Sequence, residues 1–211
     1  MNYRKIDLKT WERLEHFEAF MLSGTSFSLT TKIDVTHFYK KIKQKQLKFY
    51  PMFIHQTTMV VNSFENFRLG YNEKNELVLW DNVEPNYTIN SKVSENFISV
   101  WTPWIKSTTN FQQSYLKTLT SCEISFKMTP QNDMPMNIFV ISMLPWTSFD
   151  GFNLNINNND KFIAPIITAG KIINENEQLL LPLAIQVHHA SCDGYHVGRF
   201  LEKLQNQLNL F

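Results

Sequence analysis

The nonapeptide HHASCDGYH, at positions 188–196, concentrates side chains that are able to do chemistry. It holds three histidines, one cysteine and one aspartate. Such a set predicts one of three kinds of site: a metal site, a thiol nucleophile, or a single general base with supporting residues.

The spacing of these residues disfavours a metal site. His188 and His189 are neighbours at the end of an apolar stretch typical of a strand, where adjacent side chains point to opposite faces. A closed zinc site would use paired cysteines or two histidines four residues apart on a helix, and the sequence has neither. We therefore expect no metal ion.

Cys192 is a weak candidate for a nucleophile. A reactive thiol needs a base and an electropositive setting, whereas the adjacent Asp193 would raise the pKa of the thiol. A small buried thiol is the simpler interpretation.

The pattern His-x-x-x-Asp-Gly, formed by His189, Asp193 and Gly194, fits a general base. An imidazole titrates near neutral pH and accepts a proton when one ring nitrogen is free and aimed at a substrate. Asp193 could fix the loop, and Gly194 could relieve the turn into a helix. The same pattern fits a buried histidine held by a carbonyl and an aspartate that caps a helix, so both interpretations stay open at this point.

Apolar periodicity places the nonapeptide between a long strand, 179–187, and a closing helix whose apolar face includes Val197, Phe200, Leu204 and Leu208. Helices are also expected at 10–21 with Thr10 as N-cap, at 34–48, and from Pro51 to about residue 63. Strands are expected at 26–35, in a hairpin over 67–81, at 96–102, 137–146 and 152–157, and at 162–173, which forms an antiparallel hairpin with 179–187. This order predicts an α+β fold with helices against a largely antiparallel or mixed sheet.

Length and composition limit the class of protein. The 211 residues, 43% of them hydrophobic, are enough for one sizeable core, so residues 1–211 are expected to form a single domain. A net charge of +1 argues against binding to nucleic acid or to an anionic membrane. The polar first residues and the lack of an 18-residue apolar run predict a cytoplasmic protein without a signal peptide or spanning helix. The two cysteines are expected to stay reduced.

Five stretches together resemble the chloramphenicol acetyltransferases, in the order and spacing of that family. They are WERLEHFEAF at 11–20, LKFYPMFIH at 47–55, SMLPWTSFDGFNLNI at 142–156, FIAPIITAGK at 162–171, and LLLPLAIQVHHASCDGYHVGRFLEKLQ at 179–205. The resemblance implies a two-layer α+β sandwich of the CoA-dependent acyltransferase type. It also implies a homotrimer with active sites between subunits, which transfers acetyl from acetyl-CoA to the primary 3-hydroxyl of chloramphenicol and so inactivates the antibiotic.

The resemblance also implies roles for single residues. His189 matches the general base and Ser142 the hydroxyl that stabilises the oxyanion. Asp193 matches a structural carboxylate that pairs with an arginine, here Arg13; the alternative for Arg13 is a solvated helix residue in a weak surface pair. Direct transfer needs only a base for the alcohol and a donor for the thioester oxygen, with no acyl-enzyme.

Further matches line the two substrate sites. The coenzyme residues implied are Lys48, Trp146 and Thr168, for which a solvated lysine, a core indole and an ordinary strand threonine are the alternatives; for Trp146 we expect a contribution to the core. The residues implied for the apolar antibiotic pocket are Phe20, Phe97, Leu154, Ile156 and Ile166. Ile172 and Ser191 depart from the tyrosine and valine usual in the family.

Two other functions compete with antibiotic acetylation. One is CoA-dependent O-acetylation of a different hydroxyl acceptor, because the same architecture serves dihydrolipoyl acyltransferases. The other is a binding protein for an apolar ligand that has lost its catalytic geometry. The presence of His189, Ser142 and Asp193 argues against a binding protein, and the absence of a lipoyl domain or flexible linker argues against the dihydrolipoyl role.

Overall fold

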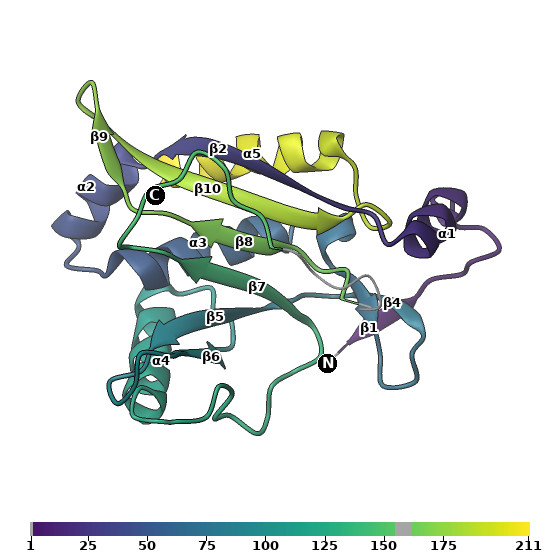
Figure 1. Ribbon diagram of the computed structural model, residues 1–211, viewed down its shortest axis with the longest axis horizontal. Coiled ribbons are helices and arrows are strands. Elements are labelled where there is room, and N and C mark those ends of the chain that lie inside the picture. The colour runs from purple at the N-terminus through teal and green to yellow at the C-terminus, as the bar shows by residue number, and fades with distance from the viewer. Residues whose placement is uncertain (1, 155–161) are drawn as a thin grey trace.

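The structure is a computed structural model that describes residues 2–154 and 162–211 (Figure 1). Its helices are α1 (Leu14–Ser23), α2 (Thr36–Gln44), α3 (Phe49–Val61), the short 3-10 helix η1 (Glu65–Phe67), α4 (Thr108–Cys122) and α5 (Gly194–Asn209). Its strands are β1 (Tyr3–Lys5), β2 (Ser26–Asp34), β3 (Leu69–Tyr71), β4 (Leu77–Trp80), β5 (Glu84–Asn90), β6 (Phe97–Trp101), β7 (Ile138–Met143), β8 (Ile166–Ala169), β9 (Ile173–Glu175) and β10 (Gln178–His188). This confirms the α+β class.

The described strands form a large mixed sheet and a small antiparallel one. The large sheet runs β2-β10-β8-β7-β5-β6, with β9 paired to β10, and the small sheet runs β1-β4-β3. Pairing is parallel at β5–β7 and β7–β8 and antiparallel elsewhere in the large sheet. The long strand β10 is the centre of this arrangement because it pairs with β2, β8 and β9.

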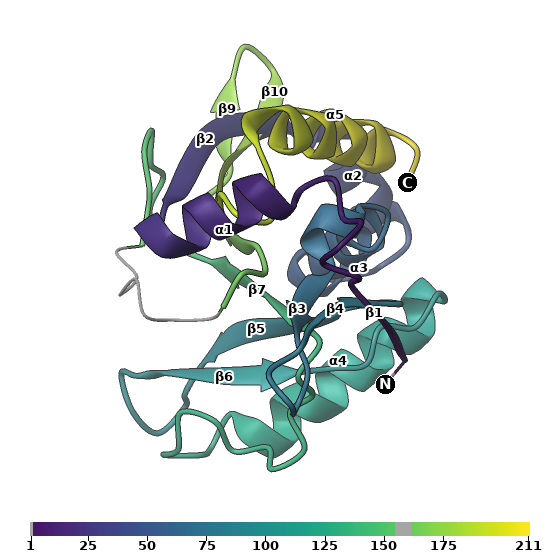
Figure 2. The same ribbon diagram turned by 90° about the vertical axis from the view of Figure 1, so that its right-hand side faces the viewer.

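The helices α2, α3, α4 and α5 lie on one side of the large sheet (Figure 2). Side chains of one register row point into this layer: Tyr87, Ile141, Ile167 and Ile185 sit on four neighbouring strands, and all four are fully buried. β-branched and aromatic residues suit such a strand face, because their stiff side chains pack well on a pleated surface. This layer forms the main core.

The opposite face of the large sheet carries polar side chains. The adjacent register row contains Thr30, Ala184, Thr168 and Ser142 on β2, β10, β8 and β7. The chain after β7 crosses part of this face, where the backbone N–H of Phe152 donates to the Thr30 hydroxyl at 3.2 Å. Since successive residues of a strand alternate between faces, one sheet supports a core on one side and polar chemistry on the other.

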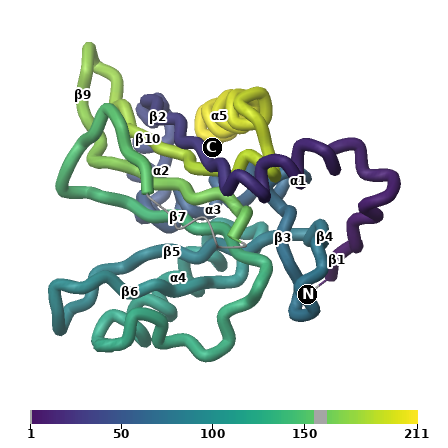
Figure 3. Tube along the Cα trace, turned by 45° about the vertical axis from the view of Figure 1, so that its right-hand side comes forward, coloured from purple at the N-terminus to yellow at the C-terminus, as the bar shows by residue number. Residues whose placement is uncertain are grey.

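A second apolar cluster fixes the N-terminal segment at the end of the molecule where β10 passes into α5 (Figure 3). It joins Phe17 of α1, Leu69 and Leu79 of the small sheet, Ile163, and Ala190 of the nonapeptide. The start of α1 is thereby held beside the loop that carries His189.

Several predicted elements differ in the structure. The first helix begins at Leu14 rather than at residue 10, because Thr10 forms a turn with Asp7 and Arg13 is the N-cap. Residues 152–154 of the predicted strand 152–157 are not in a strand, and the remainder lies outside the described residues. The strand β5 and the helix α4 were not predicted.

Within the described part of the chain, none of the helices has the length and apolar character needed to cross a membrane.

The packing of α5 on the core gives a test of the fold. Phe200 is fully buried and contacts Phe64 and Phe67 edge-on, so Phe200→Ala should lower the free energy of unfolding by about 3–5 kcal/mol. Leu22→Ala is the control, because Leu22 is 92% exposed and should change stability by less than about 0.5 kcal/mol. Denaturant unfolding of both variants measures the difference. Equal midpoints would contradict the assigned packing of α5.

Candidate functional site

His189 lies directly after β10, in the short loop that leads into α5. Its backbone N–H donates to the carbonyl of Thr25 at 2.8 Å, which continues the contact between β10 and the segment before β2. The imidazole stacks on the ring of Phe20, with centroids 3.8 Å apart and planes 4° from parallel, and Phe27 meets it edge-on at 5.1 Å. The side chain is nevertheless 28% exposed. The ring is therefore oriented by apolar contacts and open to a substrate on one side.

Arg13 holds the loop from the start of α1. Its guanidinium makes two hydrogen bonds with the carboxylate of Asp193, at 2.7 and 2.8 Å. It also donates to the carbonyls of His189 and Ala190, each at 2.8 Å. The planar fork of an arginine suits such bidentate binding and carries further donors for the loop. The contact predicted between Arg13 and Asp193 is present, and the weak surface pair offered as its alternative is wrong, since the Arg13 side chain is only 14% exposed.

Asp193 is held as a carboxylate. The hydrogen bonds from Arg13 lower the pKa of Asp193 below its ordinary value. Its Oδ1 lies 3.2 Å from Nδ1 of His189, which is within the distance of an ion pair. The two atoms are not aligned as a hydrogen bond, and among the described residues Nδ1 of His189 has no hydrogen-bond partner. A carboxylate there favours a proton on Nδ1, which leaves Nε2 as the basic nitrogen.

Sequence reasoning missed the contacts of three other residues that hold the loop. Asn66, next to η1, donates from its amide to the carbonyl of Ser191 at 2.9 Å. The buried hydroxyl of Ser191 lies 2.9 Å from the carbonyl of His188 and 3.1 Å from that of Ile163, to which it can donate. His196 accepts the backbone N–H of Asp193 at 3.0 Å. The spacing Asp-x-x-His gave a signal for His196, because an acceptor three residues after an N-cap is a capping-box position.

The two other candidates in the nonapeptide are unsuited to nucleophilic or basic chemistry. Cys192 is fully buried, and burial raises the pKa of its thiol to about 12. This confirms the interpretation as a small buried thiol. His188 accepts the backbone N–H of Ala190 on its Nδ1 at 3.2 Å, and burial lowers its pKa. Among the described residues, no group of three or more His, Cys, Asp or Glu side chains is arranged to hold a metal ion.

Ser142 and Thr168 form a second polar centre on the face of the sheet opposite α2 to α5. Their hydroxyl oxygens are 3.1 Å apart, and Thr168 is 3% exposed. Both belong to the register row of Ala184, five residues before His189 on β10. At about 3.3 Å per residue this places them roughly 16 Å along the strand from His189. Within one chain, the predicted base and the predicted oxyanion donor are therefore too far apart to contact the same carbonyl group.

The predicted coenzyme residues other than Thr168 lie at the surface. Lys48 is the exposed N-cap of α3, and its backbone N–H donates to the side chain of Gln112 at 2.7 Å. Trp146 follows β7 and is 65% exposed, so the prediction that its indole contributes to the core is wrong. The turn after Met143 ends the alternation of the strand and turns this side chain outward.

The predicted acceptor residues are spread over several elements. Phe20 contacts His189 directly, whereas Phe97 on the edge strand β6 is 50% exposed. Leu154 is 43% exposed, and its backbone N–H donates to the Gln186 side chain at 2.7 Å. Ile166 is half-buried beside Gln186, and Ile156 lies outside the described residues. The large exposed aromatic side chains leave apolar surface that a ligand or a second subunit could cover.

Comparison with known proteins gives one consistent family. Residues 1–205 match the sequence profile described as chloramphenicol acetyltransferase. A chloramphenicol acetyltransferase of Staphylococcus aureus is 48% identical over 97% of this chain and 95% of its own length. Chloramphenicol acetyltransferase 3 of Escherichia coli is 41% identical over 99% of this chain and 98% of its own length.

Solved structures agree with the fold. A chloramphenicol acetyltransferase structure superimposes with a TM-score of 0.89 at 21% identity and covers 98% of this chain and all of its own. A dihydrolipoamide acetyltransferase of Azotobacter vinelandii superimposes with a TM-score of 0.70 at 15% identity, over 92% of this chain and 86% of its own. The architecture is thus shared with other acyltransferase cores.

The role of Arg13 in holding the loop can be measured as stability. Arg13→Ala should lower the free energy of unfolding by about 2 kcal/mol or more at pH 7, because several charge-assisted hydrogen bonds are lost from a largely buried guanidinium. Arg4→Ala is the matched control, since the Arg4–Glu65 pair is exposed and its loss should cost less than about 1 kcal/mol.

The difference in stability between wild type and Arg13→Ala should also depend on pH. The pKa of Asp193 is lowered in the folded protein, so its contribution is present above the ordinary Asp pKa of about 3.9 and is lost as the pH falls through the lowered value. The difference between wild type and Arg13→Ala should therefore shrink in acid. Melting temperatures measured from pH 7 to pH 3 test this, and a difference that grew in acid would be incompatible with the ion pair.

Proposed function

Because the chain belongs to the chloramphenicol acetyltransferase family, we propose that it transfers the acetyl group of acetyl-CoA to the primary 3-hydroxyl of chloramphenicol. The observation that carries this proposal is the arrangement of His189, whose ring is oriented by Phe20 and whose loop is held by Arg13 and Asp193. Relatives named as chloramphenicol acetyltransferases match almost the full chain. The acetylated antibiotic is the inactivated product, and residues 1–211 contribute one catalytic domain to each subunit.

The proposed mechanism is a direct transfer. His189 takes the proton of the substrate hydroxyl on Nε2 while the oxygen attacks the thioester carbonyl of acetyl-CoA. The hydroxyl of Ser142 donates to the oxyanion of the tetrahedral intermediate. Collapse of the intermediate breaks the C–S bond, and the imidazolium returns its proton to the leaving thiolate, so that acetylated antibiotic and CoA are formed. No acyl-enzyme is needed, which agrees with the high pKa of the buried Cys192.

Asp193 and Arg13 act on the position of His189 rather than on the substrate. A carboxylate whose pKa is lowered is a poor base, and both of its oxygens are occupied by the guanidinium. The carbonyl of His189 is bound to the same guanidinium, so the backbone of the base and the carboxylate beside its ring move together. We therefore assign both residues as positioning residues.

The proposed enzyme is a homotrimer with its active sites between subunits. The separation of about 16 Å along the strand between His189 and the Ser142–Thr168 pair supports this, because both must reach one carbonyl group. A neighbouring copy that presents the Ser142 side of its sheet to His189 would supply the missing oxyanion donor. The unpaired outer edge of β2 in the described sheet is also suited to contact another subunit.

The remaining predicted residues would line the two substrate channels. Lys48 would bind the phosphate end of acetyl-CoA, and Thr168 and Trp146 would line its pantetheine path. The side chains of Phe20, Phe97, Leu154, Ile156 and Ile166 would form the apolar wall for the nitrophenyl ring. The exposed indole of Trp146 and ring of Phe97 fit this assignment, because both lack cover in the single chain.

The first test is a thiol-release assay with acetyl-CoA and chloramphenicol. His189→Ala should lower kcat at least about 10²- to 10⁴-fold, since it removes the base, while Ser142→Ala should keep measurable turnover with a loss of up to about 10²-fold. An analogue in which fluorine replaces the acceptor hydroxyl is the substrate control and should bind without reacting. Release only with other alcohols would support the alternative acceptor, and full activity of His189→Ala would exclude the mechanism.

The second test addresses the shared site. His189→Ala and Ser142→Phe should each be inactive alone, because one lacks the base and the other blocks the oxyanion site. In trimers assembled from an equal mixture, roughly a quarter of the interfaces would combine an intact His189 with an intact Ser142 from the other subunit. Activity near a quarter of wild type should therefore return. A mixture as inactive as its components would show that both residues must belong to the same chain.

A further inference from the structure

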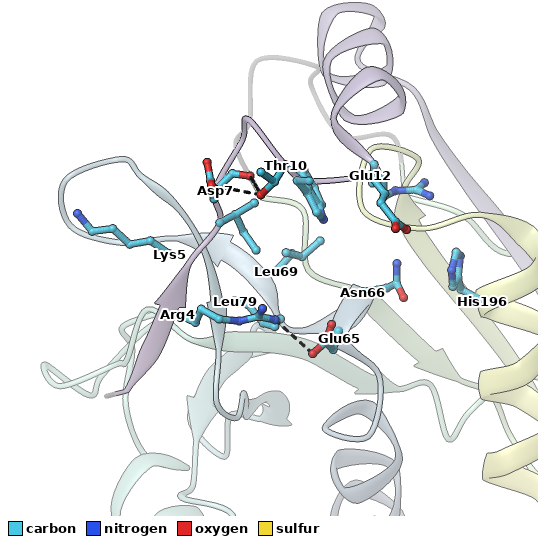
Figure 4. Close-up of a pocket in the computed structure, with 13 residues that line it drawn as sticks. Arg4, Lys5, Asp7, Thr10, Glu12, Glu65, Asn66, Leu69, Leu79 and His196 are labelled. Carbon is cyan, nitrogen blue, oxygen red and sulfur yellow. Dashed lines mark hydrogen bonds and ion pairs between the residues drawn. The ribbon is translucent and has the colours of Figure 1, made fainter.

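His196 is a further histidine beside the catalytic loop, which we define as residues 189–193 between β10 and α5. It is in the first turn of α5 and lines a cleft of about 680 Å³ together with Glu12, Arg13, Glu65 and Asn66 (Figure 4). Arg13 and Asn66 both bind the loop from this cleft. His196 is the third cleft residue that contacts the loop, and the proposed chemistry gives it no role so far.

The contact of His196 with the loop defines its protonation state. Nδ1 of His196 is 3.0 Å from the backbone nitrogen of Asp193, which can only donate. Nδ1 must therefore carry a lone pair, and the proton of the neutral ring is on Nε2. A helix leaves the N–H groups of its first turn without partners, and an acceptor at the third position normally satisfies that of the N-cap.

The contact connects His196 to the proposed base through one residue. The backbone of Asp193 is bound by His196, and its carboxylate is bound by Arg13 and lies 3.2 Å from Nδ1 of His189. Without the acceptor, the N–H of Asp193 would lose its partner at the point where the loop enters the helix. The side chain of Asp193 could then rotate away from His189 even with Arg13 in place.

We propose that His196, in its neutral form, is a positioning residue for the reaction: it holds the backbone of Asp193 so that His189 stays aimed at the substrate. This inference rests on the proposed function of His189 as the base. The catalytic loop then requires two neutral imidazoles at once, His189 to accept the substrate proton and His196 to accept a backbone N–H.

The surroundings of His196 make this requirement dependent on pH. The nearest charged group is Asp193, at 3.8 Å on the loop. The charged and titratable groups that line the two clefts beside His196 are Arg4, Lys5, Asp7, Glu12, Arg13, Glu65, Tyr195, Arg199, Glu202 and Lys203. Burial lowers the pKa of His196 below its ordinary value, so the neutral form prevails at pH 7. In acid the ring gains a proton on Nδ1, and the N–H of Asp193 then faces a donor.

The test is the pH profile of kcat/KM. In wild type, a proton on His189 removes the base. A proton on Nδ1 of His196 sets two donors face to face, which should cost more activity than removal of the ring, so the acid limb of log kcat/KM should approach a slope of two. In His196→Gln, which keeps an acceptor but does not titrate, the slope should be one and the activity at pH 8 close to wild type. His196→Ala should lower kcat roughly 10- to 100-fold at pH 8 with little change in KM.

His16→Gln is the control, because His16 is an exposed histidine on α1 and its replacement should leave the slope at two. The proposal would be overturned if the slope of His196→Gln equalled that of wild type, or if His196→Ala kept the kcat of wild type. Should His196→Ala not fold, His196→Gln alone decides. The ¹⁵N NMR shift of His196 Nδ1 at pH 8 should be that of an unprotonated nitrogen. This measurement does not depend on activity, so it tests the state of His196 even if wild type fails to acetylate chloramphenicol.

Discussion

The geometry of the loop that carries His189 depends above all on one guanidinium. Arg13 is bound to both oxygens of Asp193 and to the carbonyls of His189 and Ala190, so a residue at the start of α1 determines the shape of a loop almost 180 residues later in the chain. A loop that joins a strand to a helix has few backbone partners of its own. The second apolar cluster, which contains Phe17 and Ala190, keeps the two segments together so that these bonds can form.

The two faces of the large sheet serve different purposes. Its inner face is buried under α2 to α5 with the row of Tyr87, Ile141, Ile167 and Ile185, and its outer face carries hydroxyl groups on the neighbouring row. His189 sits at the end of β10, well beyond the Ser142–Thr168 pair. A single copy therefore holds the proposed base and the proposed oxyanion donor too far apart to act on one carbonyl group. Such a division would make catalysis depend on association, while the core of each subunit remains complete.

Local patterns were sufficient to predict most elements, including β10, α5 and the hairpin of β3 and β4, because these have clear apolar periodicity. The helix α4 was missed because polar residues outnumber its buried Phe111, Tyr115 and Cys122. The Arg13 contact could not come from spacing, since tertiary packing alone brings it to Asp193; only the family resemblance implied it. Trp146 was misplaced because residue type favours burial, whereas the turn after β7 points it outward.

The buried state of the two cysteines has a practical consequence. Cys122 and Cys192 are the only thiols of the chain, and both are inside the core. Cys192 lies three residues from the proposed base, yet its high pKa keeps it almost free of thiolate at neutral pH. Alkylating and disulfide-forming reagents should thus react slowly with both cysteine side chains. A colorimetric thiol reagent should therefore react with liberated coenzyme A in preference to the thiols of the enzyme.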